Sequence, residues 1–195
     1  GWVILALAAV ADVLATRRKV KSIITATSSY IKAGRWRIMS KIHWPSLLIS
    51  IAIAEAVGAL SGLLAGDIRA VYSSLVQPPL SPPGWLFLLV WTVLFALMGI
   101  AAYLVYHAPV EHSQKSTALR FYAAQLVVNF FWPIIFFRFQ LFGWAVAVII
   151  LLVVLVIITM VLFARINRTA MYLLIPYLLW LLFATYLNIG VAILN

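Results

Sequence analysis

Three apolar stretches of the sequence each carry a tryptophan with a second side chain about one helical turn away. The pairs are Trp91 with Phe95, Asn129 with Trp132, and Trp180 with Ala184. If the three helical faces converge, they enclose an aromatic-walled cavity with a few amide hydrogen-bonding groups. Such a lining suits a large, flat, mostly apolar ligand, because ring stacking supplies contact area and the polar groups fix orientation. Instead of lining a cavity, each ring could pack in the core or lie in an aromatic belt at the membrane surface. A belt position is at least as consistent with Trp44, Trp85 and Trp144, which lie near helix ends.

Most other site chemistry is excluded. The chain has no cysteine, which excludes disulfides, thiolate metal sites and cysteine nucleophiles. The three histidines, His43, His107 and His112, fall at the ends of apolar stretches or in a loop, which disfavours haem ligation at mid-membrane. No phosphate-binding glycine loop, hydrolytic triad or metal cluster is present in the sequence. We therefore predict no conventional catalytic residue, no metal site and no required cofactor.

Composition indicates an all-α integral membrane protein. The 195 residues are 66% hydrophobic and 9% charged, with a mean hydropathy of +1.13, which is more apolar surface than one soluble core can bury. The net charge of +10 comes largely from eight of fourteen Lys and Arg residues between Arg17 and Lys41. Because these lie next to membrane spans, anionic lipid headgroups are the expected counter-charge, and nucleic acid is not a predicted partner.

Five stretches are long and apolar enough to cross a bilayer. They cover residues 45–66, 84–106, about 118–137, about 141–164 and about 170–194. The connections at 67–81 and 107–117 complete an antiparallel five-helix bundle. More basic residues fall on the membrane side that carries the N-terminus of the bundle (Lys41, Lys115, Arg120, Arg165 and Arg168) than on the opposite side (Arg69 and Arg138). Basic residues favour the cytoplasmic side, so the N-terminus of the bundle is expected in the cytoplasm of a bacterium.

The approach to the second span contains four prolines within residues 77–83. Proline fixes its own φ and pushes the preceding residue out of the helical region, so the helix is expected to begin at about Pro83. We expect this rigid segment to lie over the mouth of the bundle, where Tyr72 and Gln77 could close over a ligand.

The third and fifth spans carry polar faces beside prolines. Gln125, Asn129, Trp132 and Phe136 share one face of the third span, and Tyr177, Trp180, Ala184 and Asn188 share one face of the fifth. Pro133 removes the hydrogen bond to the Asn129 carbonyl, which predicts a polar notch at that depth. Pro176 is expected to kink the fifth span.

The first span has a stripe of small residues at every fourth position: Ser50, Ala54, Gly58, Gly62 and Gly66. Such a stripe lets another helix approach closely, and it is the basis for expecting a homodimer. Beside it lies Glu55, the only acidic residue in the five spans, which is expected to be protonated or hydrogen-bonded. A structural hydrogen bond is favoured there over a proton or cation site, because no polar partners are evident.

Residues 1–40 form a basic extension that precedes the membrane domain at 41–195. It could be a targeting segment, a half-buried anchor, or residues upstream of a true start at Met39, and the last is favoured because the following residues read as the opening of the first span. No function is placed on residues 1–38.

Three motifs carry a family resemblance. They are Pro82-Pro83-x-Trp85 through Val90-Trp91-Thr92, Met98-Gly99 and Ala102-Tyr103-Leu104-Val105; Gln125-x-x-x-Asn129-x-x-Trp132-Pro133; and Pro176-Tyr177-x-x-Trp180-x-x-Phe183-Ala184-Thr185-x-Leu187-Asn188. Residues 43–195 thereby resemble the TspO/MBR family, the tryptophan-rich sensory proteins and mitochondrial translocator proteins. The resemblance implies a ligand such as protoporphyrin IX or a related tetrapyrrole. It also implies a site made of Tyr72, Trp91, Phe95, Gln125, Asn129, Trp132, Trp180, Ala184 and Asn188.

The sequence departs from the family pattern at several positions. Leu80 and Ser81 stand where relatives often have Trp and His, and Phe130 stands where a Trp is common. Sterol is a second ligand class in mitochondrial members, but the basic residue that the cholesterol pattern needs after Tyr186 is missing.

Three functions remain open at this stage. The leading one is a tetrapyrrole-binding receptor or sensor in a bacterial membrane rather than the mitochondrial outer membrane. The second is light-dependent porphyrin degradation, with Trp91 and Trp180 as electron donors. The third is a small-molecule transporter that uses Glu55.

Overall fold

A computed structural model describes residues 20–21, 25 and 42–195. Residues 44–195 form one compact unit. The interpretation of the basic extension, including a start at Met39, concerns residues that lie almost wholly outside the described ones.

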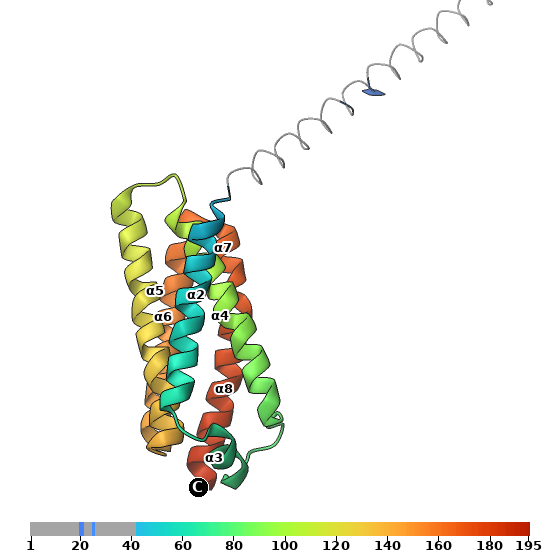
Figure 1. The fold of residues 1–195 in the computed structure, drawn as a ribbon, viewed down its shortest axis with the longest axis vertical. Coiled ribbons are helices and arrows are strands. Elements are labelled where there is room, and N and C mark those ends of the chain that lie inside the picture. The colour runs from blue at the N-terminus through green and yellow to red at the C-terminus, as the bar shows by residue number, and fades with distance from the viewer. Residues whose placement is uncertain (1–19, 22–24, 26–41) are drawn as a thin grey trace, which may run out of the picture. The chain divides into compact units, whose positions relative to one another are not determined.

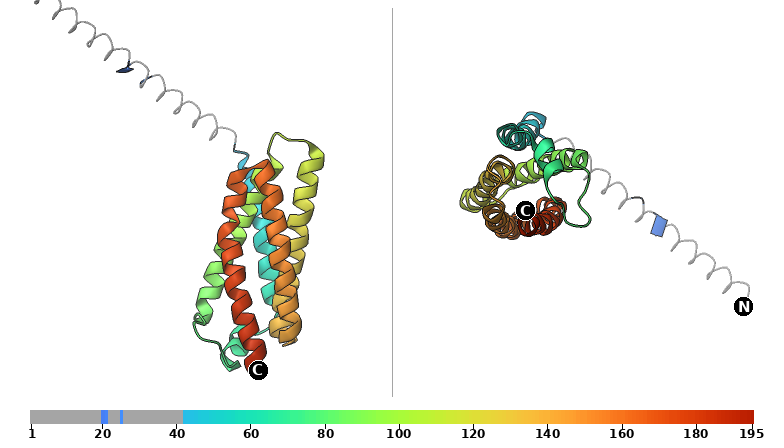
Figure 2. Two further views of the ribbon diagram at one scale, coloured as in Figure 1. Left: turned by 180° about the vertical axis from the view of Figure 1, so that it is seen from behind. Right: turned by 90° about the horizontal axis from the view of Figure 1, so that it is seen from below.

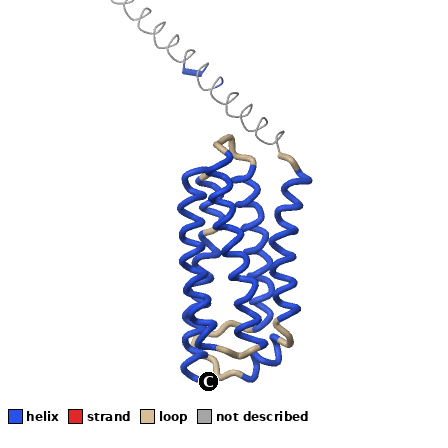
Figure 3. Tube along the Cα trace, turned by 90° about the vertical axis from the view of Figure 1, so that its left-hand side faces the viewer, coloured by secondary structure: helices blue, strands red, loops and turns tan. Residues whose placement is uncertain are grey.

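The compact unit is a helical bundle, as predicted (Figure 1). Its elements are α2 (Trp44–Leu64), α3 (Ile68–Ser74), α4 (Gly84–Tyr106), α5 (His112–Pro133), η1 (Ile134–Arg138), α6 (Phe142–Ile166), α7 (Arg168–Leu173) and α8 (Ile175–Leu194). Five helical segments are long and apolar enough to span a membrane, with η1 continuing α5 and α7 leading into α8. The described residues contain no strand (Figure 3). The all-α prediction with five spans is therefore confirmed.

Two connections differ from expectation. The polar stretch predicted as a loop at 107–117 is helical from His112 onward. Its residues are not apolar, so hydropathy could not reveal that the helix continues past the hydrocarbon layer. The connection at 67–81 contains the short helix α3, whose start is capped by Asp67 accepting a hydrogen bond from the Ala70 amide at 2.9 Å. An aspartate at this position is a recognisable cap signal.

Helices α2 and α4 approach each other through small residues. A Cβ atom added to Gly99 would lie 2.6 Å from the Ile51 Cα atom, so only glycine fits there. The Ser50 hydroxyl donates to the Gly99 carbonyl at 2.8 Å, and Gly58 faces the Phe95 ring. The upper part of the predicted small-residue stripe therefore packs within the chain, whereas Gly62 has open space beside it.

Prolines interrupt both helices that carry polar faces. After Pro133 the α5 helix widens into the π-helical turn η1, and the nearby Phe130 carbonyl accepts a hydrogen bond from the buried Ser61 hydroxyl of α2 at 2.6 Å. This contact supplies a polar group close to the predicted notch. In the fifth span the helix is interrupted at Leu174, directly before the turn that holds Pro176.

Helix α4 reaches the last span in two different ways. Its C-terminal half packs closely on α7. Towards its N-terminal end, aromatic rings bridge it to α8: Phe87 meets Trp180 with a centroid distance of 5.7 Å, and Trp91 meets Tyr177 at 6.2 Å. Figure 2 shows α3 and the connection to α4 crossing this end of the bundle, beside the C-terminus. This end of the bundle is thus covered by α3 and the segment that connects it to α4.

Candidate functional site: a cavity beneath the proline loop

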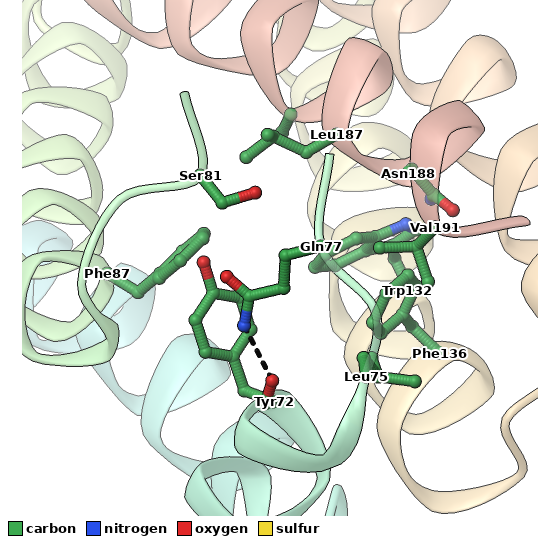
Figure 4. A pocket seen from close by; sticks show the side chains of 11 residues that line it. Tyr72, Leu75, Gln77, Ser81, Phe87, Trp132, Phe136, Leu187, Asn188 and Val191 are labelled. Atoms are coloured by element: carbon green, nitrogen blue, oxygen red, sulfur yellow. Dashed lines mark hydrogen bonds between the residues drawn. The ribbon is translucent and has the colours of Figure 1, made fainter. Parts of the chain in front are cut away.

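The cavity lies at the end of the bundle where α3 and the proline loop, residues 75–83, cross between α4 and α8 (Figure 4). Its walls come from every element at that end except α2 and α6. The lining residues are Tyr72, Leu75, Gln77, Ser81, Phe87, Trp132, Phe136, Ala184, Leu187, Asn188 and Val191. None of these side chains is charged, and four of them are aromatic.

The proline loop is held on the α3 and α4 side by its own polar groups. The Tyr72 hydroxyl donates to the Pro82 carbonyl at 2.6 Å, and the Gln77 amide donates to the Tyr72 carbonyl at 2.7 Å. Desolvation by burial raises the pKa of the Tyr72 phenol above its usual value, which favours the protonated, hydrogen-donating form. The Ser81 hydroxyl donates to the Pro78 carbonyl at 2.8 Å.

The loop is also fastened to the end of the last helix. The Asn195 side chain pairs with both backbone groups of Val76, accepting from its N–H at 3.0 Å and donating to its carbonyl at 3.0 Å. The Tyr186 hydroxyl donates to the Pro79 carbonyl at 2.9 Å. A Cβ atom on Gly190 would lie 2.6 Å from Pro78, so the absence of a side chain there lets the loop rest on α8. The proline loop is therefore a lid with defined attachments on two sides.

Two polar side chains in the cavity wall have no hydrogen-bond partner among the described residues. They are Asn188, through both its Nδ2 and its Oδ1 atoms, and Trp132, through its Nε1 atom. Asn188 is 1% exposed and Trp132 is 8% exposed. Unmade hydrogen bonds at buried groups cost about 1–3 kcal/mol each, so leaving these three buried atoms unpaired is unfavourable in the closed structure.

The structure brings some of the predicted site residues together and leaves others apart. Four of the predicted residues line the cavity: Tyr72, Trp132, Ala184 and Asn188. The other five predicted residues lie outside its lining: Trp91, Phe95, Gln125, Asn129 and Trp180. The cavity therefore lies nearer the loop end of the bundle than the predicted set implies.

The amides of Gln125 and Asn129 are engaged with a tyrosine. The fully buried Tyr177 hydroxyl donates to Gln125 Oε1 at 2.9 Å and accepts from Asn129 Nδ2 at 2.7 Å. The Gln125 amide nitrogen also lies 3.7 Å from the Met98 sulfur. These two amides thus tie α5 to α8, and this structural role was not foreseen from their spacing.

The two tryptophans expected at the ligand form an aromatic layer behind the cavity. Trp91 contacts Phe95 and Tyr177, while Trp180 packs edge-on against Phe87, which itself lines the cavity. Both indoles are half-buried, and the Trp180 Nε1 atom is buried without a partner among the described residues. The Trp180 ring is therefore separated from the cavity by one phenyl ring.

Several lining residues were not singled out from the sequence. Phe87 is one helical turn before Trp91, and Leu187 and Val191 lie three and seven residues after Ala184, on the same helical face. Helical periodicity could have placed them on the same faces, but it gives no depth along the helix. No feature of the sequence indicated that Leu75 lines the cavity, because the path of the loop depends on its attachments to α8.

The cavity is small while the loop is in place. The space open to water-sized molecules is about 30 Å³, room for about two waters. Pockets that hold a drug-sized ligand have volumes of about 300–1,000 Å³. A large planar ligand would therefore have to displace the proline loop or the side chains beneath it.

Glu55 lies apart from this cavity, halfway along α2 and half-buried. It makes no hydrogen bond or ion pair with any described residue. The structural hydrogen bond favoured from the sequence is therefore not found among the described residues.

Comparison with known proteins assigns the fold to a family. The model of the TspO/MBR family matches residues 50–194. The chain belongs to the TspO/MBR family. This span contains every residue that lines the cavity, and the five apolar helices make this TspO/MBR chain a multi-pass membrane protein.

Individual relatives match over most of their length. The chain is 36% identical over 151 residues to the tryptophan-rich protein TspO of Chlorobaculum tepidum, which covers 77% of this chain and 96% of that protein. It is 38% identical over 154 residues to a tryptophan-rich sensory protein of Cereibacter sphaeroides, covering 79% and 94%. It is 33% identical over 143 residues to the human translocator protein, covering 72% and 85%.

Proposed function

We propose that this TspO/MBR protein is a membrane receptor or sensor that binds porphyrins and related tetrapyrroles beneath the proline loop. The observation that carries the proposal is the cavity itself. Aromatic rings from α3, α4, α5 and η1 surround it, unpartnered polar atoms lie in its wall, and the loop over it is fastened by hydrogen bonds. Flat conjugated ligands suit such walls because their faces stack on rings and their edges meet polar groups.

Binding requires the loop to move. The closed cavity is roughly tenfold below the volume range of a large-ligand site, whereas the attachments that close it are a few neutral hydrogen bonds. Their net free energies are about 0.5–1.5 kcal/mol each, so an open state is accessible. The ligand would enter from the end of the bundle that carries α3.

Titration of the purified protein in lipid nanodiscs with protoporphyrin IX tests the proposal. We expect saturable quenching of tryptophan fluorescence in the dark, because Trp132 lines the cavity and Trp180 lies one ring behind it. Replacing Trp132 with alanine should weaken binding by about tenfold or more, since it removes a stacking surface and a donor. Trp144→Ala is the matched control, because Trp144 is 70% exposed and does not line the cavity. Absence of saturable binding by the wild type would overturn the proposal.

Light-dependent porphyrin degradation is the second candidate function. This activity is favoured by the contact between Trp180 and Phe87, which lines the cavity. The centroids of the two rings are 5.7 Å apart. Electron transfer over one intervening ring is geometrically feasible. Trp180→Phe should retain most of the dark affinity and lose product formation under illumination. Unchanged product formation in Trp91→Phe and Trp180→Phe would remove this candidate and leave the binding proposal intact.

A further inference from the structure

A row of aromatic rings leads from the cavity wall along α8. It begins at Tyr72 and Phe87, which both line the cavity and whose ring centroids are 5.2 Å apart (Figure 4). Phe87 meets Trp180 at 5.7 Å, and Trp180 meets Phe183 at 5.6 Å. Phe183 then stacks on Tyr186 at 6.3 Å. Contacting aromatic rings have centroids about 4.5–7 Å apart, so the row is continuous.

The rings of this row differ in how readily they lose an electron. Indole and phenol rings are oxidised by one electron far more easily than phenyl rings, so Trp180 and Tyr186 can act as donors. Phe183 lies between these two donors and contacts both of them. It therefore serves as a bridge that divides one long electron transfer into contacts between adjacent rings.

The Trp180 end of this segment has no group to take a proton. An indole that has lost an electron becomes a neutral radical only when its N–H proton passes to an acceptor. The Trp180 Nε1 atom is buried and has no hydrogen-bond partner among the described residues. The oxidised indole therefore stays a radical cation, which is a stronger oxidant than the neutral radical. A buried, unpaired charge is also costly, so passing the charge to a neighbour is favoured.

The Tyr186 end is where a proton can leave. Its side chain is 42% exposed, and its hydroxyl donates to the Pro79 carbonyl. Because the loop that contains Pro79 precedes the span beginning at Gly84, this hydroxyl lies at the boundary of the membrane, where water is available. A phenol that loses an electron and releases its proton to water becomes a neutral radical. No charge then remains inside the bundle.

The other phenols beside the row are poorer end points. Tyr177 is 0% exposed, and its hydroxyl is held between the amides of Gln125 and Asn129, neither of which takes a proton. Burial raises the pKa of the Tyr72 phenol, which opposes loss of its proton. Tyr186 is therefore the favoured place for an oxidised ring to settle.

We propose that Trp180, Phe183 and Tyr186 form a one-electron path from the membrane boundary to an oxidant beside the cavity wall. The oxidant, an electronically excited aromatic molecule, takes one electron from Trp180 and is itself reduced by one electron. Tyr186 returns an electron to Trp180 across Phe183 and releases its phenolic proton to water. A hydrogen-atom donor in the water, such as ascorbate, then restores the phenol. The path goes beyond the proposed function, because it needs no particular ligand.

Flash photolysis of the protein in lipid nanodiscs, with no added ligand, tests the path. A flash at the long-wavelength edge of indole absorption ejects electrons from tryptophan but does not excite phenols, and nitrate in the buffer captures the electrons. In the wild type we expect tyrosyl-radical absorption to grow as indole-radical absorption decays. Tyr186→Phe and Trp180→Phe should each lose most of this growth. Tyr172→Phe is the matched control, because Tyr172 is 56% exposed and lies on α7, outside the row.

Two substitutions of the bridging ring separate electron transfer from packing. Phe183→Leu keeps both donors and should slow the growth of the tyrosyl signal severalfold, whereas Phe183→Tyr, which keeps a ring, should restore it. Growth at the wild-type rate and yield in Tyr186→Phe or in Phe183→Leu would overturn the path, as would a wild type that forms no tyrosyl radical. If protoporphyrin IX does not bind but the tyrosyl signal depends on Tyr186 and Phe183, the proposed function fails and the path stands.

Discussion

The attachment of the proline loop to α8 gives a direct kinetic prediction. Tyr186→Phe removes the hydroxyl that donates to the Pro79 carbonyl and leaves the ring in place. Tyr186 is 42% exposed, so the bond is a neutral one near the surface, with a net free energy of about 0.5–1.5 kcal/mol. Since 1.4 kcal/mol corresponds to tenfold, the open state should become about two- to tenfold more populated.

The assay is stopped-flow tryptophan quenching by protoporphyrin IX in nanodiscs. Opening precedes entry, so we expect the association rate constant to rise by about this factor. Because the closed cavity is too small for the ligand, the bond is absent from the complex, and Kd should fall by about the same factor. Asn195→Ala removes two contacts with Val76 and should give a larger acceleration. Tyr172→Phe is the matched control, because Tyr172 is 56% exposed and lies on α7, at the other end of the bundle.

The reasoning would be refuted if Tyr186→Phe and Asn195→Ala both bind and release ligand at the wild-type rates. In that case the ligand would enter between the helices and not beneath the loop. A rise in Kd with an unchanged association rate constant would instead place Tyr186 in contact with the bound ligand.

Three further outcomes are expected. Gly190→Ala should displace the loop, because the new Cβ atom would lie 2.6 Å from Pro78. Stopped-flow should then show faster association, and association at the wild-type rate would show that the loop does not rest on α8. Tyr177→Phe leaves Gln125 Oε1 and Asn129 Nδ2 without their hydrogen-bond partner. It should lower the free energy of unfolding by about 2–6 kcal/mol, measured by denaturation in detergent. No measurable loss of stability would contradict this hydrogen-bond network. Gly99→Ala should lower the free energy of unfolding by about 1–3 kcal/mol in the same assay, because α2 must move away from α4. Wild-type stability of this variant would show that α2 and α4 are not in tight contact at Gly99.

The membrane helices could be predicted from sequence because their signals are local. A bilayer requires about 20 apolar residues in a row, so helix positions follow from hydropathy, and the start of α4 at Gly84 follows from the proline before it. Hydropathy does not detect polar helical turns, which is why the beginning of α5 and the short helix α3 were missed. Both contain polar residues that a helix tolerates outside the hydrocarbon layer.

The site was predicted only in part, because residues on one helical face differ in depth. The spacing of Gln125, Asn129 and Trp132 correctly places them on one buried face. It cannot show that the first two meet Tyr177, 52 and 48 residues away, while the third reaches the cavity.

The sequence by itself determined that this protein crosses a membrane as a helical bundle with a rigid proline segment at one end, since chain stiffness and hydropathy are properties of short stretches. Only the tertiary structure decided which rings face the cavity, which amides are already paired, and that Tyr186 and Asn195 hold the loop closed. Those features depend on the rotation and depth at which helices pack, and these are set by contacts between residues far apart in the chain.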